Sequence, residues 1–161
     1  MKYLLVVVLS GAILSCMPAG ENPEQLITEA KALDAAWLEA YNARNLEAVM
    51  AGYWNSPDLV SYPPGAMEIK GWENMKAQLQ QEFSMGPGGK LEILTSNYTV
   101  HGNVVSTNGT WRYTMAGPDG APMEFLGRYS DLKAKHAGKL VYIMDHASVP
   151  LPPPPDEQKM P

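Results

Sequence analysis

The clearest pattern in the chain is a run of apolar residues spaced three or four positions apart. This run comprises Leu26, Ala30, Leu33, Trp37 and Tyr41. Such spacing places the side chains on one face of an α-helix. The helix should begin at Pro23, because Asn22 can cap it, proline suits the first helical position and Gln25 completes a capping box. The sequence therefore predicts a long amphipathic helix that starts at residue 23.

Two shorter helices are expected after the long one. Asn45 can cap a helix over Leu46 to Gly52. A second apolar face predicts a helix over Gly71 to Met85; its members are Trp72, Met75, Leu79 and Phe83. Between these helices, Asp58 to Tyr62 has the pattern of a short strand. It should end at the prolines that follow, because proline cannot donate to a sheet ladder.

The second half of the chain has the alternation typical of strands. Four long strands are expected, over Leu91 to His101, Val104 to Met115, Pro122 to Lys133 and Gly138 to Pro150. Short turns rich in glycine, asparagine and proline separate them, and such turns join antiparallel neighbours. Helices followed by an antiparallel meander indicate the α+β class.

The first residues have the composition of a targeting segment. Lys2 precedes an apolar run from Leu4 to Leu14, which is shorter than the about 20 residues that span a bilayer. The run ends in a sequence that resembles a bacterial lipobox, so we expect a leader over residues 1–15 and lipidation of Cys16. Ordinary signal cleavage near Ala19 is the alternative.

The rest of the chain divides into a tether, one domain and a tail. We expect the tether over residues 16–22, the domain over residues 23–150 and a disordered, proline-rich tail over residues 151–161. A lipidated cysteine would anchor the protein in the cell envelope. Met17 after the cysteine favours the periplasmic side of an outer membrane, and a secreted or periplasmic protein is the alternative.

Composition and charge exclude several classes of function. The chain is 45% hydrophobic and 18% charged, which is typical of a globular domain, and its formal net charge is −5. It has no cluster of lysine and arginine, so no nucleic-acid partner is expected. The single cysteine has no disulfide partner. The three histidines, His101, His136 and His146, lack the spacing of metal ligands, and no phosphate or dinucleotide motif is present. We therefore expect neither metal nor cofactor.

Several local motifs, in their order and spacing, resemble the NTF2-like superfamily. They lie over Trp37 to Val49, Tyr62 to Gly65, Gly109 to Trp111, Gly127 to Ser130 and Gly138 to Ser148. Within the superfamily the chain is similar to SnoaL-like polyketide cyclases, ketosteroid isomerases and the bacterial DUF4440 group. The resemblance implies a cone, in which a curved antiparallel sheet wraps around the long first helix and opens at one end to a pocket. It also implies a homodimer that pairs through the outer face of the sheet.

The last strand carries the main candidate for chemistry. In a regular strand, Tyr142 and His146 share one face and Asp145 lies on the other. His146 could act as a general acid or base near neutral pH, or it could be a structural residue of the wall. Arg128 could bind an anionic group of a substrate, or it could point outward and pair with Glu124. The pattern leaves open which face lines the cavity.

Aromatic residues are numerous enough to line a pocket for a small molecule. The residues expected to line it are Asp58, Tyr62, Trp72, Trp111 and Tyr113. Three functions are compatible with these features. The first is the binding of a small apolar or amphipathic molecule. The second is a cofactor-independent isomerase, cyclase or dehydratase-like enzyme that uses His146, and the third is a structural dimer without ligand.

Overall fold

A computed structural model of the chain describes residues 21–86 and 88–151. The expected leader, the lipidation site at Cys16 and most of the tether lie outside the described residues. The expected proline-rich tail also lies outside them, apart from Leu151. The description that follows therefore concerns the expected domain.

Three helices form as the apolar patterns predict. They are α1 over Pro23–Asn42, α2 over Leu46–Met50 and α3 over Trp72–Ser84. The side chain of Asn22 caps α1 by accepting a hydrogen bond from the Glu24 amide at 3.0 Å, and Asn45 caps α2 in the same way. These caps satisfy amides that have no partner within the helix. None of the described helices has the length and apolar character needed to cross a membrane.

The strands form one six-stranded sheet. Its members are β1 (Val60–Tyr62), β2 (Ile69–Lys70), β3 (Lys90–His101), β4 (Val104–Ala116), β5 (Pro122–His136) and β6 (Lys139–Ser148). The order across the sheet is β2-β1-β6-β5-β4-β3. The long strands β3 to β6 pair antiparallel in sequence order, which confirms the predicted meander. The short β1 adds to the edge of β6 in parallel, a pairing between segments far apart in the sequence.

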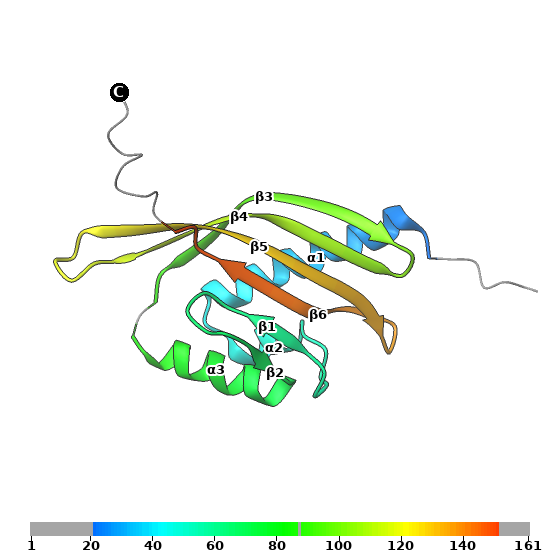
Figure 1. Cartoon of the computed structure of the whole chain (residues 1–161), viewed down its shortest axis with the longest axis horizontal. Helices are drawn as coiled ribbons and strands as arrows, with labels where there is room; N and C mark the ends of the chain where they lie inside the picture. Colours follow the sequence, from blue (N-terminus) through cyan, green and yellow to red (C-terminus); the bar gives the residue numbers. More distant parts are fainter. Residues whose placement is uncertain (1–20, 87, 152–161) are drawn as a thin grey trace, which may run out of the picture.

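The sheet curves around α1, which lies along its concave side (Figure 1). One group of buried side chains joins the first turns of α1 to the sheet and includes Leu26, Ala30 and Val105. A second group packs α2 and α3 beneath the sheet and includes Val49, Met50 and Leu79. The expected cone, with one long and two shorter helices, is confirmed.

Two bulges determine which side chains face the inside of the cone. In the pairing of β5 with β6, Leu132 lies opposite Met144 and Lys133 lies opposite Tyr142, so Ile143 is an extra residue. An extra residue shifts the alternation of a strand by one position. Asp145 therefore lies on the same face of β6 as Tyr142. A similar shift occurs in β3 between residues 93 and 95.

Candidate functional site

The cone encloses a cavity of about 720 Å³ between α1, α3 and the concave face of the sheet. Most of its wall is apolar or aromatic, and includes Trp37, Leu38, Met75, Trp111, Tyr113 and Phe125. Polar groups are fewer; the acidic ones are Asp34, Glu82, Asp131 and Asp145. A cavity of this size, with an apolar wall and a few polar groups, is typical of sites that bind small molecules.

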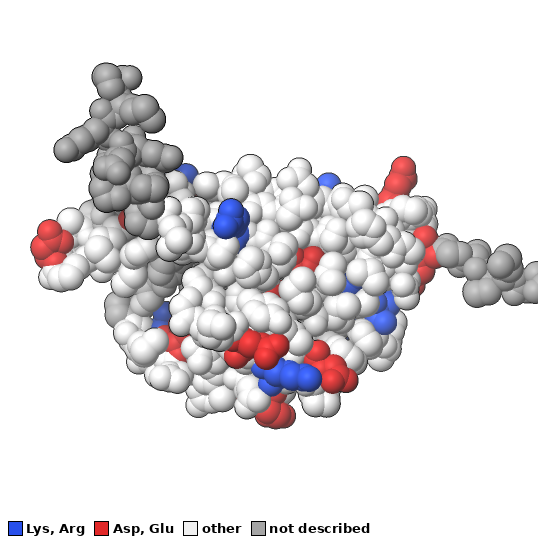
Figure 2. Space-filling model, in the orientation of Figure 1, with Lys and Arg blue, Asp and Glu red and all other residues white. Residues whose placement is uncertain are grey.

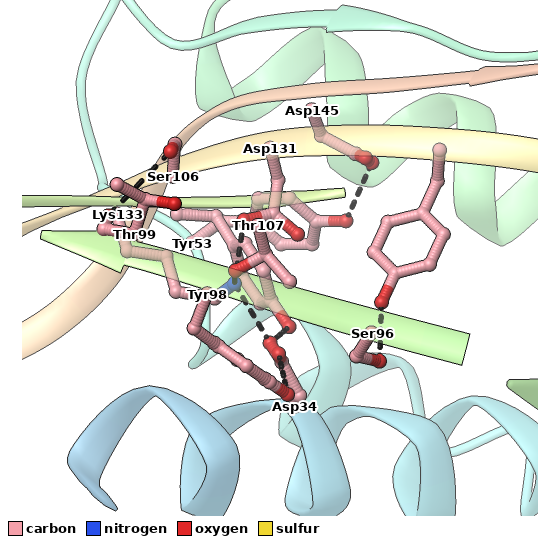
Figure 3. Close-up of polar contacts among 12 residues, drawn as sticks. Asp34, Tyr53, Ser96, Tyr98, Thr99, Ser106, Thr107, Asp131, Lys133 and Asp145 are labelled. Carbon is pink, nitrogen blue, oxygen red and sulfur yellow. Dashed lines mark hydrogen bonds and ion pairs between the residues drawn. The ribbon is translucent and has the colours of Figure 1, made fainter. Parts of the chain in front are cut away.

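A buried lysine lies behind the polar part of this wall. Lys133 has no exposed surface, and its Nζ atom donates to Asp131 Oδ1 at 2.5 Å and to Thr107 Oγ1 at 2.6 Å. The same Nζ lies 3.0 Å from Asp34 Oδ1 (Figure 3). A buried ammonium group is tolerated only when it is paired and hydrogen-bonded. These three partners meet that requirement.

Asp34 connects the long helix to three strands. Its carboxylate accepts hydrogen bonds from the hydroxyl of Tyr98 in β3, at 2.9 Å, and from the hydroxyl of Tyr142 in β6. With Lys133 of β5 it therefore has partners on three strands of the sheet. A charge-assisted network of this kind fixes the position of α1 inside the cone.

Burial raises the pKa of Asp131 to about 7, from an ordinary value of 3.8. The positive charge of Lys133 lowers the pKa of this carboxyl group, but burial outweighs it, and the charges of Asp34 and Asp145 add to the rise. This follows because the charged form of a carboxyl group is disfavoured in a poorly solvated site and beside like charges. Asp131 therefore gains and loses its proton near neutral pH.

Asp145 differs from Asp34 and Asp131 because no cationic side chain of the described residues pairs directly with it. Its Oδ2 accepts a hydrogen bond from the Tyr53 hydroxyl at 3.1 Å (Figure 3). Burial raises its pKa, although the hydrogen bond from Tyr53 and the charge of Lys133 both lower it. The side chain is half-buried and lines the cavity. Asp145 is thus the carboxylate best placed to meet a bound molecule.

Ser61 lies next to Asp145 in the sheet. The two residues are paired in the parallel register of β1 with β6, and both line the cavity. Ser61 is only 1% exposed, and its Oγ has no hydrogen-bond partner among the described residues. A buried hydroxyl without a partner is costly, so a ligand group that hydrogen-bonds to this atom would remove that cost.

His146 lies on the outside of the cone. It borders a shallow depression with Tyr62, its Nδ1 is 3.3 Å from Ser130 Oγ, and it does not line the main cavity. The prediction that His146 shares a face with Tyr142 was wrong, because it assumed a regular strand. The extra residue Ile143 reverses the alternation and directs Asp145 inward instead.

Arg128 also lies on the outer face. It is exposed, and its Nε donates to Ser148 Oγ at 3.2 Å. The described structure therefore does not bring His146 and Arg128 together in the main cavity. It is Arg112, not Arg128, that approaches Glu124, with 3.8 Å between Nη1 and Oε1.

The five residues expected to line the pocket divide into three groups. Trp111 and Tyr113 line the main cavity. Tyr62 borders only the outer depression. Asp58 is exposed at the surface, and Trp72 packs in the helical layer, where its Nε1 donates to the Met50 carbonyl at 3.2 Å; neither borders either space.

The polar cluster could have been found from one feature of β5. Tyr129, Asp131 and Lys133 alternate with Arg128, Ser130 and Leu132, so they share a face. The structure shows that this face lies inside the cone. Among residues 21–86 and 88–151, no group of three or more histidine, cysteine, aspartate or glutamate side chains is arranged to hold a metal.

A curved antiparallel sheet around a long helix, with a cavity between them, defines an NTF2-like protein, and solved structures agree. An NTF2-like superfamily protein from Salmonella enterica is 18% identical, with a TM-score of 0.69, and the match covers 83% of this chain and 97% of that one. An NTF2-like protein of unknown function from Shewanella oneidensis is 22% identical, with a TM-score of 0.66 over 76% of this chain and 98% of that one. These similarities show the fold.

A third similar structure is a ketosteroid isomerase-like protein from Erwinia carotovora. It is 20% identical, with a TM-score of 0.63, and the match covers 78% of this chain and 96% of that one. The model of the SnoaL-like domain matches residues 35–143, and the chain belongs to this family. No curated protein matches the chain.

Proposed function

We propose that the protein binds a small, mainly apolar molecule in the cavity of the cone. The observation that carries the proposal is the cavity itself, about 720 Å³ of space with a largely aromatic wall and a polar cluster at one side. Apolar surface in the wall would favour the body of the molecule, and the polar cluster would orient it. The SnoaL-like domain is compatible with binding and with catalysis, because one fold serves many functions.

Native mass spectrometry and thermal-shift screening against a metabolite set test this proposal. A matched pair of variants makes the test specific: Ala35 and Ala36 are neighbouring, exposed residues of α1, and only Ala35 lines the cavity. Ala35→Trp should occupy part of the cavity and weaken binding, whereas Ala36→Trp should leave binding unchanged. Equal effects of the two variants, or no ligand in either assay, would contradict binding in the cavity.

Proton transfer is a second candidate function. It is favoured by Asp145, a carboxylate that faces the cavity and whose pKa burial raises, which makes it a stronger base than an ordinary aspartate. The reaction would be an isomerisation, cyclisation or dehydration that needs no cofactor. Once a substrate is found, Asp145→Asn should abolish turnover and His146→Ala should preserve it. The opposite result would return the catalytic role to His146.

We also propose that the protein is a lipid-anchored homodimer of the cell envelope. The lipobox-like sequence before Cys16 supports the anchor. Metabolic labelling with an alkyne fatty acid should modify the wild type and not Cys16→Ala.

The outer face of the sheet supports the dimer. The face of the sheet in Figure 2 has few charged side chains, and Leu126 on the outer side of β5 is 57% exposed. Leu126→Glu should convert a dimer to a monomer in light scattering, and a wild-type monomer would refute the dimer.

A further inference from the structure

One part of the cavity wall has more negative than positive charge. Its acidic residues are Asp34, Glu82, Asp131 and Asp145, whereas the basic residue among the described lining residues is Lys31, which is exposed. Lys133 lies behind the wall and is already shared by Asp34 and Asp131. Among the described residues, the side-chain hydrogen bond that Asp145 receives comes from the neutral hydroxyl of Tyr53. Within the polar cluster of Asp34, Asp131 and Asp145, the acidic group without a direct cationic partner among the described residues is therefore Asp145.

A second, independent feature marks the same place as a ligand subsite. The Oγ atom of Ser61, beside Asp145 in the sheet, is buried and has no partner among the described residues. Ser61 Oγ and the free oxygen of Asp145 can both accept hydrogen bonds. Two neighbouring acceptors suit a group with several donors, and an ammonium group has three.

We propose that the natural ligand is an amphipathic amine, whose protonated nitrogen binds Asp145 and Ser61 while its apolar body fills the aromatic part of the cavity. This inference rests on the proposed function, because it names the class of molecule that the cavity takes. A cation would offset the negative charge of the cluster, which a neutral alcohol would not. A carboxylate would be repelled by Asp145 and by the neighbouring acidic groups.

The walls around the subsite fit this assignment. The ring of Tyr53 lies 5.1 Å from the ring of Tyr142, and the aromatic surface continues through Trp37 and Trp111 along the cavity. Aromatic faces attract cations as well as apolar groups. Lys133 makes such a cation–π contact, because its Nζ lies 4.8 Å from the centre of the Tyr142 ring. A second cation on the cavity side would find a similar environment.

Three compounds with the same body and different head groups test the proposal. They are 4-phenylbutylamine, 4-phenylbutan-1-ol and 4-phenylbutyrate, titrated at neutral pH into the purified protein. Calorimetry gives the affinity, and tryptophan fluorescence gives an independent reading because Trp37 and Trp111 line the cavity. A charge-assisted hydrogen bond should make the amine bind about 10- to 100-fold more tightly than the alcohol. The carboxylate should bind most weakly.

Variants show which residues cause the preference for the amine over the alcohol. Asp145→Asn keeps an acceptor for Tyr53 but removes the charge, so it should abolish the preference for the amine and preserve binding of the alcohol. Ser61→Ala should weaken amine binding by a smaller factor. Glu39→Gln is the control, because Glu39 is an exposed acidic residue of α1 that does not line the cavity. It should retain the full preference.

The outcomes separate this inference from the proposed function. Equal binding of the amine and the alcohol by the wild type would overturn the amine assignment and leave a cavity that binds small molecules. Failure of all three compounds to bind would overturn both. The comparison of head groups is made on the wild type, so the result does not depend on the folding of any variant.

Discussion

The Nζ atom of Lys133 in β5 lies 3.0 Å from Oδ1 of Asp34 in α1, and the lysine has no exposed surface. This ion pair joins the central helix to the sheet at the wall of the cavity. The same lysine also binds Asp131, so two carboxylates depend on one positive charge. The geometry of the cavity wall and the stability of the fold therefore depend on the same residue.

Replacement of this lysine should be strongly destabilising. Lys133→Met keeps much of the side-chain volume but leaves Asp34 and Asp131 without their cation. Loss of one partner of a buried ion pair costs about 3–5 kcal/mol of unfolding free energy. Chemical denaturation measures this loss.

The matched control is Lys135→Met on the same strand. The ion pairs of Lys135 with Glu21 and Glu29 are partly exposed and should contribute less than about 1 kcal/mol. Similar losses in the two variants would contradict a special role for Lys133.

The contribution of Asp131 to the stability of the fold should decrease as the pH rises toward neutrality. The pKa of Asp131 is about 7 in the folded protein and 3.8 as an ordinary value, so the folded state holds the proton more tightly. The contribution of Asp131 to the free energy of unfolding is fully present below pH 3.8 and is lost as the pH rises through about 7. Since each pH unit corresponds to about 1.4 kcal/mol per proton, the free energy of unfolding should fall by up to about 4 kcal/mol across this range.

Asp131→Asn isolates that contribution. The variant removes the titrating group, so its unfolding free energy should change less between pH 4 and pH 7 than that of the wild type, in urea denaturation at several pH values. The test compares how the unfolding free energy of each protein changes with pH, and not the absolute values, because the substitution also weakens the interaction of residue 131 with Lys133. Parallel slopes for the two proteins would show that Asp131 does not hold the proton.

The helices, the long strands and the α+β class could be predicted from local sequence signals, whereas the cone was implied by the resemblance to the NTF2-like superfamily. The cap at Asn22, the apolar face of α1 and the turns between strands each depend on a few neighbouring residues. The parallel pairing of Val60 with Met144 was not predictable in this way. It joins distant segments, and the short strand expected over Asp58 to Tyr62 gives no signal of the strand with which it pairs.

The candidate site was predicted less well, for a reason that lies in one residue. The alternation of β6 is correct up to Tyr142 and reversed after the extra residue Ile143. A bulge has no reliable sequence signal, so the rule that side chains alternate placed His146 on the face of Tyr142 and Asp145 on the opposite face. Trp111 and Tyr113 lie in an unbulged part of the register between β4 and β5, and both line the cavity as expected.

Removal of the Tyr53 hydroxyl should raise the pKa of Asp145 further. The hydrogen bond from Tyr53 stabilises the charged carboxylate and so lowers its pKa. In Tyr53→Phe the pKa of Asp145 should therefore rise, because the charged carboxylate loses a hydrogen bond that stabilises it. Titration of the carboxyl carbon by NMR measures the change. Tyr41→Phe serves as the control, since the Tyr41 hydroxyl donates to Glu82 instead. A shift of the same size in both variants would indicate a general effect of tyrosine loss.

The close approach of Trp111 to Gly127 should make this glycine irreplaceable. A Cβ atom at Gly127 would lie 2.1 Å from Cζ2 of Trp111 and 2.7 Å from the carbonyl oxygen of Ser148. Overpacking of this kind costs about 1–3 kcal/mol or more, so Gly127→Ala should lower the unfolding free energy by at least that amount and displace the indole that lines the cavity. Denaturation and the fluorescence of Trp111 report the two effects.

A double-mutant cycle distinguishes this clash from a general preference for glycine. Trp111→Ala removes the ring that a methyl group at position 127 would meet, so the further cost of Gly127→Ala should be smaller in that background than in the wild type. Residues in contact are commonly coupled by about 0.5–3 kcal/mol. The carbonyl of Ser148 remains, so part of the cost should persist. Strict additivity of the two substitutions would show that the indole does not rest on Gly127 in solution.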